Sequence, residues 1–155
     1  MPDIPTTADA GPMSYAIFQL ARAHRAYAGT LLREMELHPG QELLLMQLFD
    51  RDGQTQSELL DSVGLDHSTV SKSLRRMQDA GLLLREPAAH DRRVMVVHLT
   101  DKGLAMREPI AALWRTLEQA SARSLSKQQT ESFIETAHAI TRSIHSSALP
   151  HDGSR

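Results

Sequence analysis

Apolar residues recur near the start of this chain at the three- and four-residue spacing of an amphipathic helix. They form a stripe along one face of a helix of about 20 residues. The stripe runs through Ile17, Ala21, His24, Ala28, Leu31 and Met35. The pattern predicts a helix over residues 13–36 with one face available for packing.

A second helix is expected over residues 40–53. Pro39 suits the first turn of this helix, and Gly53 is expected to end it. Its sequence, GQELLLMQLFDRDG, is apolar almost all round at Leu43 to Leu45, Leu48 and Phe49. A helix that is hydrophobic on every side belongs in the interior of a fold.

Two short helices joined by a tight turn are predicted next. Thr55 and Glu58 have the spacing of a capping box, in which a hydroxyl and a carboxylate satisfy free backbone N–H groups at a helix start. Gly64 ends this helix, and Asp66 is the candidate N-cap of the following helix, which Gly81 stops. Two such helices form a helix-turn-helix.

The second of these helices, over residues 66–80, has a buried face and a polar face. Val70, Leu74 and Met77 fall at i, i+4 and i+7, which places them on one buried side. The opposite side carries His67, Ser68, Ser71, Lys72 and Arg75. From His67 to Gln78 there are three basic residues and no acidic one, so this helix has a local basic face.

The stretch after Gly81 predicts a two-stranded hairpin. Two short apolar runs, LLLRE and VMVVHL, are separated by PAAHDRR, which suits a long hairpin tip. A helix-turn-helix followed directly by a hairpin is a winged helix. The sequence therefore predicts a mainly α fold with a small β-hairpin wing over residues 82–99.

Two further helices are expected after the hairpin. Thr100 caps the first, in which Pro109 is expected to cause a bend. Its apolar positions are Leu104, Ile110, Leu113, Trp114 and Leu117. The last helix starts near Lys127 and repeats the pattern with Phe133, Ala137, Ile140 and Ile144.

Composition and charge narrow the class of protein. The chain has 155 residues, 23% of them charged and 41% hydrophobic, which is typical of one soluble globular domain. Its formal net charge is -2, so nucleic-acid binding would depend on a local basic face. The absence of cysteine excludes disulfides, thiolate metal sites and cysteine-based redox sensing.

Both ends of the chain lack helical or strand periodicity. Residues 1–12 are expected to be a disordered arm, and residues 149–155 a disordered tail. The start has no apolar run, so it is neither a signal peptide nor a membrane anchor. We therefore expect a cytoplasmic protein without membrane contact.

Enzymatic function finds no support in the motifs. The sequence has no nucleophile elbow, no phosphate-cradling glycine loop and no H-E-x-x-H, so we expect no catalysis and no cofactor. Its eight histidines include no pair at i, i+4, the spacing that places two imidazoles on one ion, and no metal ligands are predicted. A zinc site built from distant segments, or a winged helix that binds a protein partner, remains an alternative.

The order of these motifs resembles the multiple antibiotic resistance regulator (MarR) family of bacterial transcription factors. The resemblance rests on the short capped helix, on STVSKSLRRMQDAG and on the acid-x-Arg pair Asp91 and Arg93. The LT-x-x-G junction at Leu99, Thr100 and Gly103 adds to it. The core match runs over residues 55–103, and the flanking helices agree in order and approximate length.

The resemblance implies a homodimer that binds double-stranded DNA at a pseudo-palindromic operator. Residues 13–36 and 101–148 would supply dimerisation helices, which agrees with apolar stripes too exposed for a monomer. Residues 37–100 would form the DNA-binding lobe.

The second helix of the helix-turn-helix would then enter the major groove with its early residues nearest the base edges. The candidate contacts are His67, Ser68, Thr69, Ser71, Lys72 and Arg75. Ser68 and Thr69 are candidate donors to phosphate, while Thr69 is also a candidate for a local bond at the helix start. Lys72 and Arg75 are expected to divide base and phosphate contacts, in an order left open.

In the family the wing arginine reads the minor groove, and the resemblance gives this role to Arg93. A guanidinium suits a narrow groove, because negative potential is concentrated there and the planar fork is weakly hydrated. Asp91 is expected to fix the wing through an ion pair. Arg92 points the other way by strand alternation and is expected to meet a phosphate or solvent.

The resemblance also implies repression that a small, often aromatic and anionic, effector relieves. Such a ligand would bind between the dimerisation helices and the DNA-binding lobe. The candidate contacts are His24, Tyr27, His38, Phe49 and Trp114. For His24 the alternative is a hydrogen-bonded interface residue, and for Phe49 and Trp114 it is a place in the core.

Overall fold

The computed structural model describes residues 4–148 and consists of two compact units, which meet in sequence at Leu117 and Glu118. The first unit contains η1 (Thr6–Ala10), α1 (Pro12–Glu34), α2 (Gln41–Asp50), β1 (Gln54–Thr55), α3 (Gln56–Val63), α4 (His67–Asp79), β2 (Leu83–Pro87), β3 (Met95–Leu99), α5 (Asp101–Leu104) and most of α6 (Arg107–Ala122). The second contains the end of α6 and α7 (Lys127–Ala148). The predicted tail, 149–155, lies outside the described residues.

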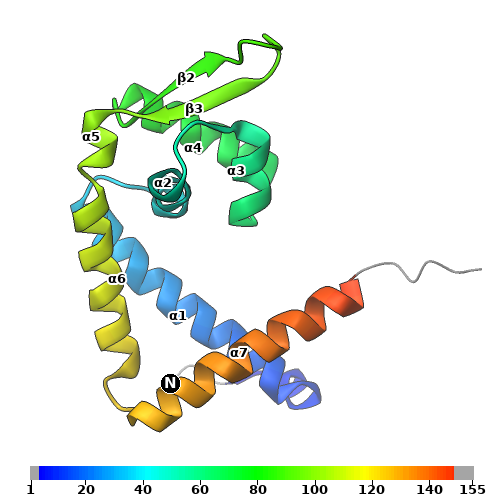
Figure 1. Cartoon of the computed structure of the whole chain (residues 1–155). Helices are drawn as coiled ribbons and strands as arrows, with labels where there is room; N and C mark the ends of the chain where they lie inside the picture. Colours follow the sequence, from blue (N-terminus) through cyan, green and yellow to red (C-terminus); the bar gives the residue numbers. More distant parts are fainter. Residues whose placement is uncertain (1–3, 149–155) are drawn as a thin grey trace, which may run out of the picture. The chain divides into compact units, whose positions relative to one another are not determined.

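The prediction of a mainly helical fold with a small β-hairpin wing is confirmed. Figure 1 shows α2, α3 and α4 gathered together, with the hairpin of β2 and β3 beside α4. The two strands are antiparallel, with Leu83 opposite Leu99 and Pro87 opposite Met95. β1 adds a third strand next to β3. Its two residues are too few to produce a strand pattern in the sequence.

The helix-turn-helix forms where its capping residues predict it. The Thr55 hydroxyl accepts the N–H of Glu58, and the Glu58 carboxylate accepts the N–H of Thr55 at 2.7 Å. Asp66 caps α4. Gly64 and Gly81, with φ of 62° and 73°, end α3 and follow α4 in the left-handed conformation, which a residue without Cβ adopts readily. These sequence signals are confirmed.

One hydrophobic core fills the first unit, and α2 lies inside it as predicted. Leu44, Leu45 and Leu48 are at most 1% exposed. α2 is shorter than expected, because Gly40 is its N-cap and it ends at Asp50. Pro39 therefore precedes the helix instead of forming its first turn.

The first residues of the chain contain more structure than the sequence predicts. Residues 6–10 form the single 3-10 turn η1 where a disordered arm is predicted. Two local bonds hold it, from the Ala8 N–H to Pro5 O and from the Gly11 N–H to Ala8 O. A turn this short has no periodic pattern that a sequence could reveal. α1 follows at Pro12, one residue before its predicted start.

The predicted bend at Pro109 is wrong. Thr100 caps a separate short helix, α5. Ala105 and Met106 form a turn that separates α5 from α6. Pro109 lies in the first turn of α6, where a missing N–H leaves no intrahelical bond unmade. Leu104, predicted to belong to the apolar stripe, is 51% exposed.

Large apolar side chains remain exposed on α1 and on α7. On α1 they are Met13, Ile17, Phe18, Leu20 and Tyr27, and on α7 they are Phe133, Ile134 and Ile144. The buried part of α1 is confined to its last turns, at Ala28, Gly29 and Leu32. Among residues 4–148, none of the helices combines the length and the apolar character that a membrane span requires.

Candidate nucleic-acid interface

α4 presents a polar face to solvent because its apolar face is fixed in the core. Val70, Leu74 and Met77 are 1%, 0% and 1% exposed. Of the predicted contact residues, His67, Ser68, Lys72 and Arg75 are exposed, while Thr69 and Ser71 are half-buried. Within residues 4–148, no carboxylate forms a salt bridge with Lys72 or Arg75. Both cations are therefore available to an anionic partner.

The start of α4 is organised around the Asp66 carboxylate. The Ser68 hydroxyl donates to it at 2.7 Å and the Thr69 hydroxyl at 2.5 Å, while the Thr69 N–H donates at 3.0 Å. The Thr69 and Ser68 hydroxyls hold the pKa of Asp66 well below its ordinary value. Both hydroxyl hydrogens are thus bonded to Asp66, so neither hydroxyl can donate to a phosphate in this conformation. The sequence leaves two roles open for Thr69, a phosphate donor or a residue with a local bond at the helix start, and the structure contains the local bond, to Asp66.

The wing tip is held by its own backbone. Asp91 accepts the backbone N–H of Arg93 at 2.9 Å, and the Val94 N–H donates to Asp91 O at 3.0 Å. Among residues 4–148 Asp91 forms no salt bridge, so the predicted ion pair is not found. Its carboxylate instead accepts the N–H two residues on, as a short carboxylate in a turn does. Strand alternation does not apply to Arg92 either, since residues 92 and 93 form a turn and β3 begins at Met95. Both arginines are exposed.

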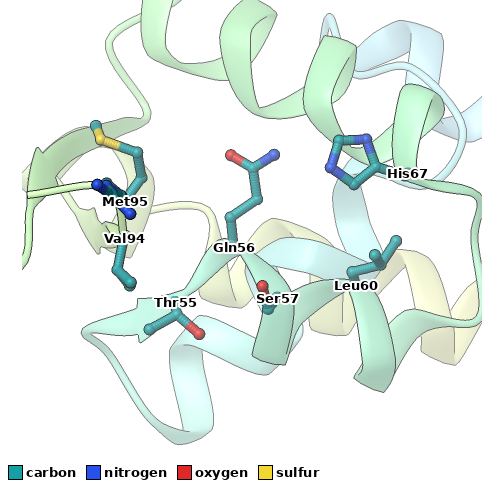
Figure 2. Close-up of a pocket in the computed structure, with 8 residues that line it drawn as sticks. Thr55, Gln56, Ser57, Leu60, His67, Val94 and Met95 are labelled. Atoms are coloured by element: carbon teal, nitrogen blue, oxygen red, sulfur yellow. The ribbon is translucent and has the colours of Figure 1, made fainter. Parts of the chain in front are cut away.

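A cleft of about 280 Å³ lies where the wing approaches the two helices. It is lined by Thr55, Gln56, Ser57, Leu60, His67, Arg93, Val94 and Met95. Figure 2 shows the side chain of Gln56 between Met95 on one side and His67 on the other. The structure therefore brings the wing arginine and the start of α4 to the same cleft, as the sequence analysis requires of a surface that contacts two neighbouring grooves.

Gln56 and Ser57 are interface candidates that sequence reasoning missed. They are the first two residues of α3 and follow the Thr55 cap directly. The capping box was a signal for them, because a capped helix start presents free backbone N–H groups, and the first helix of a helix-turn-helix crosses the DNA backbone.

Two side-chain bridges hold the base of the wing. The Arg85 Nε donates to Gln78 Oε1 at 2.6 Å, which ties β2 to the last turn of α4. The two ring nitrogens of His98 lie 3.4 Å from Asp52 Oδ2 and 3.3 Å from Glu86 Oε1. No pattern in the sequence indicated this bridging role for His98. The structure uses it to connect β3 to β2 and to the loop after α2.

The five candidate effector contacts are only partly brought together. The rings of His24 and Trp114 lie 6.4 Å apart, and the buried Nε1 of Trp114 has no hydrogen-bond partner in the described structure. Phe49 packs under the guanidinium of Arg107, 5.2 Å from its ring centre. Tyr27 and His38 are exposed. His24 and Trp114 are thus the pair that the fold assembles.

The described residues, 4–148, contain no group of three or more His, Asp or Glu side chains arranged to hold a metal ion. The zinc alternative therefore gains no support from this part of the chain. The charge that the interface presents comes instead from Lys72, Arg75 and Arg93.

Comparison with known proteins places this geometry in context. Residues 36–94 match the model of the MarR family. Over 120 residues the chain is 28% identical to the HTH-type transcriptional regulator MgrA of Staphylococcus aureus. This alignment covers 77% of this chain and 80% of MgrA.

Solved structures share the fold. A MarR mutant from E. coli complexed with operator DNA superposes with a TM-score of 0.80 and 19% identity, over 88% of this chain and 99% of that one. BpsR of Bordetella bronchiseptica, whose DNA binding is regulated by 6-hydroxynicotinic acid, superposes with a TM-score of 0.77 and 18% identity, over 84% and 98%. At these identities the likeness extends to the fold alone.

Proposed function

We propose that this chain, which belongs to the MarR family of DNA-binding transcriptional regulators, acts as a dimeric, sequence-specific repressor released by a small ligand. The family assignment confirms the resemblance found in the sequence and the expectation of a regulator that is not an enzyme. One observation carries the finer proposal. His67, the first residue of α4, and the wing arginine Arg93 border a single cleft, and Lys72, Arg75 and Arg93 form no salt bridge among residues 4–148.

In this proposal α4 enters the major groove. Its first residues lie nearest the base edges because the N-terminal part of a recognition helix points into the groove. His67 and Lys72 are exposed there. Ser71 is half-buried and contributes from the side of the helix, and Arg75 lies one turn beyond Ser71. The acceptor oxygens of Ser68 and Thr69 remain able to receive a base N–H even while their hydrogens are bonded to Asp66.

Arg93 enters the adjacent minor groove. The Asp91 carboxylate accepts the backbone N–H of Arg93 at the wing tip, so the backbone that carries the guanidinium is held in one conformation. Arg92 neighbours it in the same turn and contacts phosphate or solvent. The DNA strand between the two grooves then passes the cleft at Gln56 and Ser57.

The exposed apolar residues of α1 and α7 support pairing of two chains. Phe18 is 56% exposed and Phe133 50% exposed, and apolar surface of this kind is covered in a stable assembly. We assign residues 13–36 and 101–148 to the dimer contacts and residues 37–100 to DNA. Two winged helices then read half-sites about one helical turn apart.

We place the effector beside His24 and Trp114, with Tyr27, His38 and Phe49 as further candidates. The indole N–H of Trp114 has no hydrogen-bond partner among residues 4–148, which suits an anionic ligand, and the ring of His24 suits an aromatic one. Trp114 is the single tryptophan of the chain, so its fluorescence reports binding directly. A panel of small aromatic acids that leaves both the fluorescence and the DNA affinity unchanged would contradict this assignment.

The function is tested by selecting bound duplexes from a random pool with the full chain. The expected product is an inverted repeat with half-sites about ten base pairs apart, bound more weakly at higher salt because phosphate contacts release counterions. A pool that shows no enrichment, or binding that salt does not weaken, would contradict the proposal.

A further inference from the structure

The C-terminal end of α4 is bonded to a segment far along the chain. Three consecutive carbonyls follow this helix, at Ala80, Gly81 and Leu82. The Lys102 Nζ donates to the first at 2.8 Å, the Thr100 hydroxyl to the second at 2.6 Å and the Thr100 N–H to the third at 3.1 Å. Thr100 and Lys102 thus take up every carbonyl of this turn.

Gly103 completes the contact by having no side chain. A Cβ at this position would lie 1.9 Å from the carbonyl oxygen of Leu82, far inside any tolerated distance. The Gly103 N–H also donates to the Thr100 hydroxyl oxygen at 3.0 Å. The hydroxyl therefore accepts one bond and donates another, which leaves it a single orientation.

The same segment is fixed on its other side. The N–H of Leu99, the residue before Thr100, donates to Asp52 Oδ1 at 2.8 Å, in the loop after α2. Beyond Gly103 the chain continues through α5 into α6. Residues 99–103 therefore connect the end of α4 to the wing strand β3 and to the helices that follow it.

We propose that Thr100, Lys102 and Gly103 form a brace that positions α4 and sets operator specificity without touching DNA. This inference rests on the proposed function. A recognition helix must lie at one angle to match a row of base edges, whereas phosphate contacts tolerate small rotations. When the fraction of correctly oriented protein falls, the affinity for the operator falls with it. Affinity for unrelated DNA changes little, because its contacts are mainly electrostatic.

The first test uses Lys102→Met on the duplex selected above and on a duplex of unrelated sequence. We expect a loss of about fivefold on the selected duplex, as one hydrogen bond is removed, and a loss under about twofold on the unrelated one. The dependence of log affinity on log salt keeps its slope. Lys102→Arg, which can still donate to Ala80 O, restores the affinity. Lys127→Met removes the same charge from a side chain of α7 that is 91% exposed, and its ratio of affinities for the two duplexes should equal that of wild type.

Salt dependence separates this role from direct contact with DNA. If Lys102 binds a phosphate, the slope falls by about one in Lys102→Met and both duplexes lose affinity. That result would overturn the brace, as would an unchanged affinity for the selected duplex.

A second set of variants removes the other two members. Gly103→Ala must displace either α5 or Leu82, so we expect a loss of about tenfold or more on the selected duplex. Gly11→Ala adds the same methyl where the nearest atom lies 3.8 Å away. Thr100→Val removes the hydroxyl, whereas Thr100→Ser keeps it. Only Thr100→Val should lower the ratio of affinity for the selected duplex to affinity for the unrelated one. Equal losses on both duplexes in the folded variants would contradict positioning.

These experiments distinguish a failure of the proposed function from a failure of the brace. If the wild-type chain selects no duplex, the proposed function fails. If the wild-type chain binds its selected duplex and all brace variants retain the ratio between the two duplexes, the brace alone fails.

Discussion

α4 and α7 are both amphipathic helices, but among residues 4–148 the apolar side chains of α4 are buried and those of α7 are exposed. Val70, Leu74 and Met77 of α4 are almost completely buried. On α7, Phe133 and Ile144 are 50% and 57% exposed. The same sequence pattern thus has two structural outcomes in one molecule.

Under the proposed function, this difference separates residues that fold the lobe from residues that pair two chains. The winged-helix lobe assembles around one core, with short helices fixed by caps and by β strands. α7 has 22 residues and exposes large apolar side chains, which a second copy would cover under the proposed function. Substitutions in α4 should therefore act on folding, and those in α7 on assembly.

Removing a core side chain tests the first half of this comparison. Leu74→Ala leaves a cavity beneath α4, and we expect the free energy of unfolding to fall by about 3 kcal/mol. Urea unfolding followed by circular dichroism measures it. Leu84→Ala removes the same atoms from a residue that is 59% exposed and should stay within about 0.5 kcal/mol of wild type. Equal losses in the two variants would contradict the assigned core.

A charge on α7 tests the second half. Phe133→Asp should weaken pairing of two chains roughly a hundredfold, because the carboxylate would be buried without a partner. Light scattering should then report a monomer while circular dichroism stays unchanged. Ser146→Asp places the same charge on the polar side of the helix and should keep the dimer. A wild-type chain that is already monomeric at micromolar concentration would refute this part of the account.

The wing separates DNA contact from both folding and assembly. Arg93→Ala should reduce affinity for the selected duplex by about one to two orders of magnitude, with no change in circular dichroism or in mass. Arg92→Ala, its neighbour in the turn, should cost about threefold or less, as expected for a phosphate or solvent contact. Fluorescence anisotropy with labelled duplex measures both. An unchanged affinity in the Arg93 variant would remove the minor-groove role.

A cap comparison sharpens the contrast between short and long helices. Thr55→Ala deletes the capping box of α3, which has only eight residues, and should lower the free energy of unfolding of the lobe by about 1 kcal/mol. Ser126 and Gln129 form the corresponding pair at the start of α7, at 2.8 and 3.2 Å. Ser126→Ala should leave the lobe unaffected. If both variants destabilise the lobe equally, the division between the two regions is wrong.

The smallest expected effect is a loss of stability of the lobe at acidic pH. Hydrogen bonds from Thr69 and Ser68 lower the pKa of Asp66, and those from Thr55 and then Arg51 lower the pKa of Glu58. Each carboxylate therefore stabilises the lobe above its ordinary pKa, 3.8 and 4.5 respectively, and loses that contribution as the pH falls below it.

The unfolding temperature measured from neutral pH to below 3.8 checks this sign. Asp66→Asn should show a shallower decline than wild type over the acidic part of the range. A variant that declines as steeply as wild type would show that the Asp66 carboxylate is not responsible.

Local signals in the sequence were sufficient for most of the lobe. Thr55, Asp66, Gly64 and Gly81 act through bonds or dihedral angles within a few residues, so their neighbours in sequence reveal them. The apolar spacing of α4 was equally readable. The break before α6 was not, because Pro109 suits a bend and a helix start equally well, and the choice depends on how α5 packs.

The cations of the candidate interface could be picked out from the sequence, whereas its hydrogen bonds could not. Lys72, Arg75 and Arg93 stand out as basic residues, and they lie where the pattern predicts. The hydrogen bond from the Arg93 N–H to Asp91 and the place of Gln56 in the cleft depend on backbone conformation, which the sequence leaves open. The brace of Thr100 and Lys102 joins residues 19 and 22 positions apart, beyond the reach of any local pattern.

Native mass spectrometry of the full chain on its selected duplex counts how many chains bind one operator. The account predicts two chains per duplex carrying the full inverted repeat, and weaker binding to a duplex cut to one half-site. Phe133→Asp should bind the full repeat without this gain. A complex of one chain per duplex, with equal affinity for full and half sites, would contradict a regulator that reads DNA with the lobe and pairs through its terminal helices.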